Sequence, residues 1–389
     1  MRVLVEMFDR EPIKNVLSTC VFKPEIAVYL CDTRDATFFR ESALYKLFSR
    51  RKMKTMPRFY YLDATNPGEI YEVLRAVVHD YPDAVFDFSG GRDLVLLMAG
   101  ACFAEMDLPG YYVDIPRGRF INVRGCEELA PLFKTPDFSA EDIFTMAGAT
   151  ITGSGHFLPA QLSADFQADV LAVFPLVMQN TKAWGGFVSW LQAFCAGTSA
   201  TTLEMEGPRG GHKGGGQANI TLLRHLQKAG IITRLEIGKN YISLAFKSTV
   251  HRKSLMIEGI WLELYCYVVA RQSGRFGDVR TSIVVDWAGV DGGVDNTKNE
   301  VDVFITKGVT PMFISCKMSV PSPLALSEIK MLSTKFGGWL SRTVVFTAAR
   351  LGPEHRALKN RAAEMDVLLL DAADSPPDVL LAHLEKGMA

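Results

Sequence analysis

The stretch NEVDVFIT (residues 299–306) is followed after a short turn by TPMFISCK (residues 310–317). Both stretches are rich in β-branched and aromatic residues, and their spacing predicts two antiparallel strands joined in a hairpin. Because alternate side chains of a strand share one face, Ser315 and Lys317 should point the same way, with Asp302 beside them on the adjoining strand. The hairpin therefore predicts a carboxylate, a hydroxyl and an amine around one spot.

This combination of groups suits the hydrolysis of a phosphodiester bond. A divalent metal ion can neutralise the phosphate and supply a hydroxide from bound water, while a lysine positions the nucleophile and balances developing charge. Mg²⁺ needs only one or two carboxylates, because it keeps several of its waters. Glu263, on a predicted helix, offers a further carboxylate. Taken singly, Glu263 is equally compatible with an exposed helix acid, and Asp302 with a surface residue of an edge strand.

The segments on either side of the hairpin complete a small α/β domain. In chain order they predict helix 255–272, strand 279–286, the two hairpin strands, helix 323–336, strand 343–348, helix 354–365 and strand 367–370. This order of helix, three antiparallel-type strands, helix and parallel strand resembles the core of restriction-endonuclease-like folds.

The first 125 residues alternate short apolar runs with amphipathic stretches. They predict strands at 2–8, 25–31, 58–62, 84–88 and 111–114, and helices near 12–19, 38–50, 67–79 and 93–105. Such alternation indicates a Rossmann-like parallel sheet with helices on both faces. Because ligands bind outside the carboxyl ends of such strands, the loops of interest are residues 6–14 and 87–93.

The second of these loops, DFSGGRD, follows a strand and opens a helix. Gly90 and Gly91 let backbone amides approach a ligand closely, and a helix N-terminus favours an anion. An ordinary tight turn between strand and helix explains the same residues equally well. The first loop, with Asp9 and Arg10, should lie at the same edge of the sheet.

The middle of the chain has a different character. Two apolar helices are predicted at 166–178 and 183–196, followed by the glycine-rich linker GPRGGHKGGG (residues 207–216). The next segment reads as helix, turn, strand, turn and strand, which fits a small winged-helix-like connector. Such a connector can contact DNA, and it can equally serve as a spacer or a dimer-forming module.

Together these motifs resemble those of CRISPR ancillary nucleases, which join a CARF domain, a sensor of cyclic oligoadenylates, to a PD-(D/E)xK nuclease domain. The matching pieces of the C-terminal part are WLE (261–263), NEVDV (299–303), ISCK (314–317) and FGG (336–338). By this resemblance Glu263 and Asp302 would bind Mg²⁺ or Mn²⁺ together with the Cys316 carbonyl. Lys317 would be the catalytic lysine.

Ser315 departs from this family pattern, which has Glu or Asp at its position. One carboxylate is then missing from the site unless Glu300 or Glu328 supplies it. The departure leaves open a second interpretation, in which the chain is a catalytically weak or inactive regulator that binds a ligand and nucleic acid. The retained Lys317 favours the nuclease, because a decayed site has little reason to keep an ammonium group there.

The DFSGGRD loop is similar to the N-x-[ST]-G-G-[ST]-K loop of CARF domains. Asp87 stands for the first Asn, and Arg92 falls one position before the family's lysine, whose place Asp93 takes. The resemblance implies a cyclic oligoadenylate bound across a homodimer, with cyclic tetra-adenylate the commonest ligand of this architecture. The residues expected to bind it are Asp9, Arg10, Asp87, Ser89, Gly90, Gly91 and Arg92.

The whole chain of 389 residues is thus expected to hold a CARF-like domain (1–145), a connector (146–250) and a nuclease domain (251–389). The expected activity is ligand-activated cleavage of DNA, with RNA as a further possible substrate, in type III CRISPR defence. Seven cysteines without a CxxC pair argue for a reducing, cytoplasmic location and against a zinc cluster. No stretch is apolar enough for a membrane span, and the missing GxGxxG after the first strand excludes a dinucleotide-dependent oxidoreductase.

Overall fold

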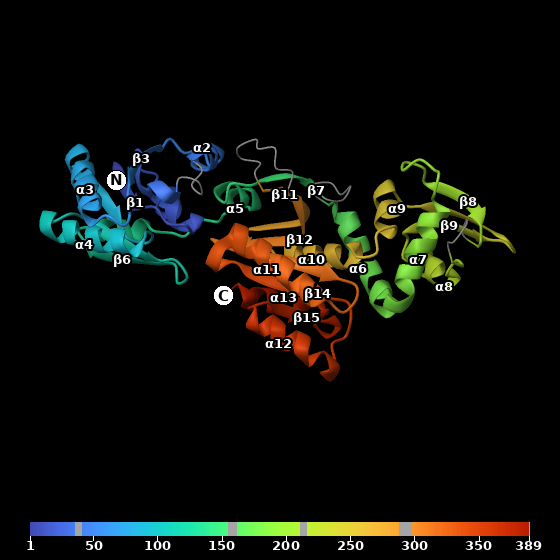
Figure 1. Cartoon of the computed structure of the whole chain (residues 1–389). Coiled ribbons are helices and arrows are strands. Elements are labelled where there is room, and N and C mark those ends of the chain that lie inside the picture. Colours follow the sequence, from blue (N-terminus) through green and yellow to red (C-terminus); the bar gives the residue numbers. More distant parts are fainter. Residues whose placement is uncertain (36–40, 155–161, 211–215, 288–297, 389) are drawn as a thin grey trace.

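The computed structural model describes residues 1–35, 41–154, 162–210, 216–287 and 298–388. The predicted helix start at Phe38 and residues 211–215 of the glycine-rich linker lie outside these ranges. The described chain forms three sheets, with strand orders β3-β2-β1-β4-β5-β6, β8-β10-β9 and β15-β14-β13-β12-β11-β7. Figure 1 shows the third sheet between the other two, so the C-terminal domain lies in the middle of the molecule.

The N-terminal sheet is parallel except for one edge strand. Its strands are β1 (Val3–Met7), β2 (Ile26–Asp32), β3 (Met56–Leu62), β4 (Val85–Asp87), β5 (Gly110–Asp114) and β6 (Arg119–Arg124). Only β6 is antiparallel, and it pairs with β5. One face is covered by α1 (Leu17–Phe22) and α2 (Glu41–Arg50), and the other by α3 (Pro67–Asp80) and α4 (Asp93–Met106). The predicted Rossmann-like sheet is therefore confirmed, with β6 as an addition.

The C-terminal sheet carries the predicted hairpin at its centre. Its own strands are β11 (Asp278–Asp286), β12 (Lys298–Lys307), β13 (Thr310–Lys317), β14 (Arg342–Thr347) and β15 (Leu368–Leu370). The first three are antiparallel, and β14 and β15 continue parallel to β13. The helices are α10 (Ile260–Gln272), α11 (Pro323–Gly337), α12 (Arg356–Glu364) and α13 (Pro377–Gly387). Up to β15 the order of helices and strands is the predicted restriction-endonuclease-like order, and α13 is an addition that the sequence analysis did not predict.

A sixth strand joins this sheet from outside the predicted nuclease range. β7 (Thr150–Ser154) pairs antiparallel with β11, and α5 (Ala140–Met146) packs on the same sheet through Phe144, whose ring meets Phe304 and Phe313. The chain division at residues 145 and 250 thus stays a prediction, while one strand of the predicted connector lies in the C-terminal sheet.

The remainder of the middle region forms a separate module. It contains α6 (Ala164–Gln179), α7 (Thr181–Phe194), β8 (Glu204–Pro208), α8 (Ile220–Lys228), β9 (Ile232–Ile237), β10 (Tyr241–Phe246) and α9 (Thr249–Leu255). α8 with its small antiparallel sheet gives the predicted winged-helix-like arrangement, and α6 extends back to stack Phe174 on Tyr265 of α10. No helix in the described part of the chain is both long and apolar enough to cross a membrane.

Candidate functional site

The centre of the C-terminal site is the point where β12 and β13 stop pairing. Their backbone register ends at Val303 and Ile314, and the next residue on β12 is Asp302. Its carboxylate bridges the strands instead, since Oδ2 accepts the Cys316 amide at 2.7 Å and the Ser315 hydroxyl at 3.2 Å. The structure thus brings together the carboxylate and the hydroxyl that the hairpin predicted.

Glu263 reaches this point from α10, the helix buried against the sheet. Its side chain is only 7% exposed, and Oε2 accepts the Ser282 hydroxyl at 3.2 Å. Ser282 lies in β11 with a φ of 50°, a left-handed conformation that is unusual for a residue other than glycine. This backbone conformation interrupts the β11–β12 register opposite Asp302. Backbone strain of this kind is common at functional sites, and no feature of the sequence indicated Ser282.

The electrostatics of Glu263 tie it to the other acids. Burial, followed by the negative charges of Asp302 and Glu300, raises the pKa of Glu263 to about 8. The Ser282 hydrogen bond and the positive charge of Lys317 act in the opposite direction. At neutral pH Glu263 is therefore largely protonated, and a nearby cation would favour its charged form.

Lys317 and Cys316 complete the hairpin side of the site. Lys317 is half-buried at the end of β13, where it pairs with Thr347 of β14. The Cys316 side chain points the other way, toward Cys266 of α10, and burial raises the pKa of its thiol. Glu328 is exposed on α11. The role of the Cys316 carbonyl as a metal ligand stays a prediction.

The donor set fits a hard cation that keeps most of its waters. Among the described residues, no three His, Cys, Asp or Glu side chains cluster as metal ligands do. The negative charge of Asp302 nevertheless helps to raise the pKa of the buried Glu263 carboxylate, and the Ser315 hydroxyl donates to Asp302. Oxygen atoms in this number suit Mg²⁺ or Mn²⁺ and do not suit zinc.

The loop after β1 in the N-terminal domain is organised by Asp9. Its carboxylate accepts the Lys14 ammonium at 2.9 Å, the Glu11 amide at 2.9 Å and the Gly91 amide at 3.1 Å. Its backbone forms two further hydrogen bonds with the Asn15 side chain. Asp9 thus ties the loops after β1 and β4 together, and one of the glycine amides expected at the ligand is used in this link.

The glycine loop after β4 is fixed to the sheet by two buried polar side chains, Asp87 and Ser89. The Ser89 hydroxyl donates to Asp87 and accepts the Val113 amide at 2.8 Å, and both polar side chains are buried. Burial raises the pKa of Asp87. A Cβ at Gly91, whose φ is 122°, would lie 2.6 Å from the Met7 side chain, so only glycine fits there. Asp87 and Ser89 therefore lie beneath the loop surface.

The remaining predicted residues face an open hollow at the carboxyl edge of the sheet. Asp9, Arg10, Gly91 and Arg92 all line it. Arg92 lies 3.4 Å from the Asp32 carboxylate at the end of β2, and the pKa of Asp32 falls to about 2, chiefly through its hydrogen bond from Arg34. Neither Lys14, in the 3-10 helix of residues 12–15, nor Asp32, the last residue of β2, was among the residues predicted to bind the ligand.

Fold and site together define a class of two-part proteins, in which a Rossmann-like domain with a ligand edge is joined to a restriction-endonuclease-like domain. No known protein family matches the sequence, and no curated protein matches it either. Solved structures match over the entire length. The protein VC1899 from Vibrio cholerae aligns with a TM-score of 0.76 and 17% identity, over 99% of this chain and 97% of that one.

Can2 from Sulfobacillus thermosulfidooxidans, solved in complex with cyclic tetra-adenylate, aligns with a TM-score of 0.71 and 17% identity, over 100% of both chains. At this level of identity the similarity establishes a shared fold. The fold of the whole chain, a Rossmann-like parallel sheet together with a second α/β sheet domain, is therefore confirmed.

Proposed function

We propose that this chain is a metal-dependent endonuclease activated by a cyclic oligoadenylate, with DNA as its first candidate substrate and RNA as the alternative, in type III CRISPR defence. The observation that carries the proposal is the convergence of Glu263, Asp302, Ser315 and Lys317 where β12 and β13 part. A protein that merely bound a ligand would not need a lysine, a buried Glu263 and a half-buried Asp302 at one break in a sheet.

The residues of this site have different proposed roles. Glu263, Asp302 and the Cys316 carbonyl would hold Mg²⁺ or Mn²⁺, which supplies charge neutralisation and a hydroxide at neutral pH. Asp302 is fixed in place by the Cys316 amide, and Glu263 by Ser282. Lys317 would direct the attacking oxygen and stabilise the developing negative charge on the phosphate.

The activator proposed for the N-terminal domain is cyclic tetra-adenylate. The support is the shared fold with Can2, whose structure holds this ligand, and the pair of arginines, Arg10 and Arg92, beside the glycine loop. Guanidinium groups suit phosphates, which they bind with paired hydrogen bonds. A ring with several phosphates fits a site shared by the two protomers of a homodimer.

A second candidate function rests on Ser315. With a hydroxyl in place of a carboxylate, the site holds fewer charged ligands, and the chain would bind nucleic acid in response to the ligand without cutting it. The two functions differ in a single measurement, which is cleavage of the substrate in the presence of metal.

The test is cleavage of plasmid and single-stranded substrates with Mn²⁺ or Mg²⁺, with and without cyclic tetra-adenylate. Lys317→Ala and Asp302→Asn should each lower the rate by about 10²-fold or more, because each removes charge stabilisation of the transition state. Lys307→Ala, at an exposed lysine of the same hairpin, is the matched control. Full activity in purified Lys317→Ala would refute the assignment.

A further inference from the structure

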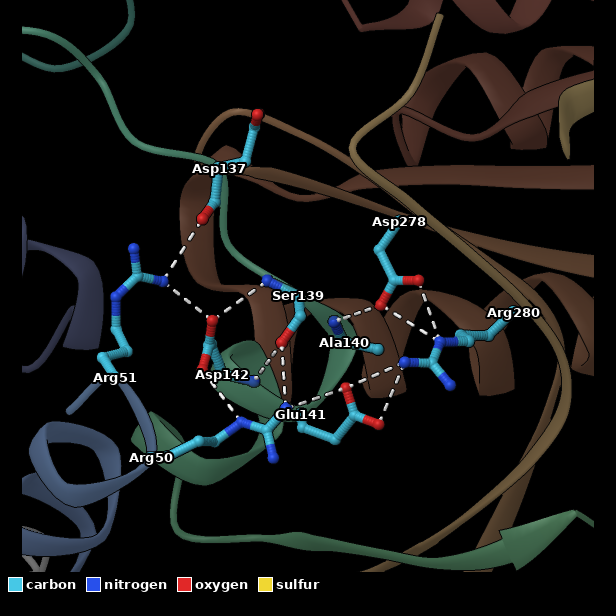
Figure 2. A network of polar contacts seen from close by, with 9 residues as sticks. All are labelled: Arg50, Arg51, Asp137, Ser139, Ala140, Glu141, Asp142, Asp278 and Arg280. Carbon is cyan, nitrogen blue, oxygen red and sulfur yellow. Dashed lines mark hydrogen bonds and ion pairs between the residues drawn. The ribbon is translucent and has the colours of Figure 1, made fainter. Parts of the chain in front are cut away.

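A short segment between the N-terminal and C-terminal domains forms hydrogen bonds and ion pairs with both of them. We call residues 137–142 the inter-domain segment (Figure 2). On the side of the N-terminal domain, the Asp142 carboxylate accepts Arg50 Nε at 3.1 Å and Arg51 Nη1 at 2.8 Å. Arg51 also donates to the Asp137 carbonyl at 3.2 Å and lies 4.5 Å above the ring of Phe138.

Asp142, the acceptor of this contact, is held in place by the rest of the segment. Asp142 is only 5% exposed, and it closes a capping box with Ser139 that fixes the first turn of α5. Charge-assisted hydrogen bonds to a buried carboxylate are stronger than those of exposed pairs, most of which contribute little. The two arginines therefore bind a rigid acceptor.

The opposite side of the segment is bonded to the start of β11. The Ala140 amide donates to the Asp278 carboxylate at 3.0 Å. Arg280 forms ion pairs with Asp278 at 2.9 Å and with Glu141 at 3.1 Å. Figure 2 shows this chain of contacts running from Arg50 to Arg280 without interruption. Glu141 takes part on both sides, because Arg50 lies 3.3 Å from the same carboxylate.

The segment is also bonded to the turn between β12 and β13. The Gly308 amide donates to the Asp137 side chain at 3.0 Å, and the Phe138 amide donates to the Gly308 carbonyl at 2.9 Å. All three strands that hold the candidate site are thus attached to this one segment. β11 carries Ser282, two residues beyond Arg280, and the hairpin carries Asp302 and Lys317.

α2, which ends at Arg50 and is followed directly by Arg51, comes after the strand that ends at the candidate ligand edge. That strand, β2, ends at Asp32, which pairs with Arg92, and the 3-10 helix η2 (Thr33–Asp35) lies between β2 and α2. A helix of 10 residues spans roughly 15 Å. Its inner face, with Leu44, Leu47 and Phe48, belongs to a hydrophobic core that continues through Phe138 and Phe144 into the C-terminal sheet. α2 is therefore packed against both domains.

We propose that ligand binding regulates the cleavage site through the contact of Arg50 and Arg51 with the inter-domain segment. An anion that draws Arg92 away from Asp32 shifts α2, and the two arginines pass this shift to β11 and to the β12–β13 turn. Because Ser282 and Asp302 lie on those strands, the distance between Glu263 and Asp302, which would hold the metal, then changes. This route rests on the proposed function and names its regulation.

A second polar contact between the domains ends away from the candidate catalytic residues. Glu11 accepts the Trp339 amide at 3.2 Å, at the carboxyl end of α11. That helix end carries none of the candidate catalytic residues.

The test compares the double variant Arg50→Gln/Arg51→Gln with the control Arg58→Gln, an exposed arginine of β3. Cyclic tetra-adenylate affinity is measured by calorimetry, and cleavage is measured with and without the ligand. The double variant should bind the ligand within about threefold of the wild type and keep its basal rate. Its activation ratio should fall on the order of tenfold, within the usual range of coupling between sites.

Normal activation of a folded double variant would refute this route and leave the proposed function standing. No ligand binding by the wild type would refute the proposed function, and the route with it. If the double variant does not fold, hydrogen exchange of the wild type decides. The ligand should change exchange in residues 137–142 and 278–282 and leave α13 unchanged, whereas an effect that spares both stretches would overturn the route.

Discussion

At Ser315 a hydroxyl group stands beside Asp302 where a carboxylate would strengthen a metal site. We predict that Ser315→Glu lowers the Mn²⁺ or Mg²⁺ concentration needed for half-maximal cleavage by roughly tenfold, since a charged ligand replaces a neutral one. Wild-type enzyme should prefer Mn²⁺, which binds such sites more tightly. Without metal the new carboxylate repels Asp302 and Glu263, so the variant should also unfold more easily.

Ser315→Gln is the matched control for this prediction, because it has the same size as Glu and no charge. Metal titrations of cleavage, and thermal unfolding with and without Mn²⁺, measure both effects. Equal titration curves for wild type and Ser315→Glu would show that another group already fills the position.

Glu263 gives the protein a dependence on pH with a defined sign. Its pKa is raised to about 8 in the folded chain, so the folded state binds a proton that the unfolded state has lost. The stability of the metal-free protein should therefore fall as pH rises from about 5 to 8, by ~1.4 kcal/mol for each pKa unit of the shift. Denaturant unfolding at several pH values measures this slope, which Glu263→Gln should largely remove. A slope equal in both proteins would contradict it.

Metal binding should depend on pH through the same proton of Glu263. Because Mg²⁺ or Mn²⁺ needs the charged form of Glu263, the metal concentration needed for half-maximal cleavage should fall about tenfold for each unit by which the pH rises toward 8. Cleavage titrations between pH 6.5 and 8.5 test this.

The sequence indicated the acids and the lysine at this scale because strand alternation fixes which side chains share a face. It did not indicate Ser282 or the double role of Asp9. A positive φ at a serine and a carboxylate that gathers three donors both depend on the packing of segments far apart in the chain, which local pattern does not encode.

Among the elements, the end of α11 offers a test of the second inter-domain contact. Gly338 has a φ of 60°, and a Cβ there would lie 2.0 Å from Glu11 Oε2. Gly338→Ala should destabilise the protein by about 1–3 kcal/mol, because a φ of 60° with a ψ of −154° is a conformation that essentially only glycine adopts, with a further loss from displacing Glu11. Gly274→Ala, with a φ of 64° and open space around it, should show the backbone cost alone.

Denaturant unfolding of these variants, with Glu11→Ala alone and combined with Gly338→Ala, forms a double-mutant cycle. Equal losses at Gly338 and Gly274, or strict additivity with Glu11→Ala, would show that the Glu11 contact contributes nothing.

Most elements followed from apolar periodicity, and the hairpin of residues 299–317 needed nothing more. Two of the exceptions are edge strands. β7 reads TITGS and pairs with β11 across more than a hundred residues of chain, and β6 exposes Arg119, Ile121 and Val123 on one face. Such edge strands have weak patterns, since each of them pairs with a neighbour on one side alone.

At the scale of the whole molecule, the C-terminal domain depends on α5. The Phe144 ring packs within 5.1 to 5.9 Å of Phe304, Phe313 and Phe336. Phe144→Ala should therefore cost about 3–5 kcal/mol of stability, measured by denaturant unfolding. A fragment starting at residue 251 should aggregate, because it exposes this core and the β11 edge, whereas one starting at residue 137 should be monodisperse by size-exclusion chromatography. Equal behaviour of the two fragments would contradict this dependence.

The pairing of β7 with β11 also makes the middle module an insertion. The chain leaves the C-terminal sheet after β7 and re-enters the domain at α10. The start of α7 lies beside the start of α10, since Trp184 Nε1 donates to the Glu258 carbonyl at 3.2 Å. In Figure 1 the module hangs from the far side of the C-terminal domain, away from the N-terminal sheet. A graft that exchanges the module at these two crossings would leave the N-terminal domain and the candidate site of the C-terminal domain joined. On the proposed function, such grafts separate the effect of the module on substrate choice from the effect of the ligand on cleavage.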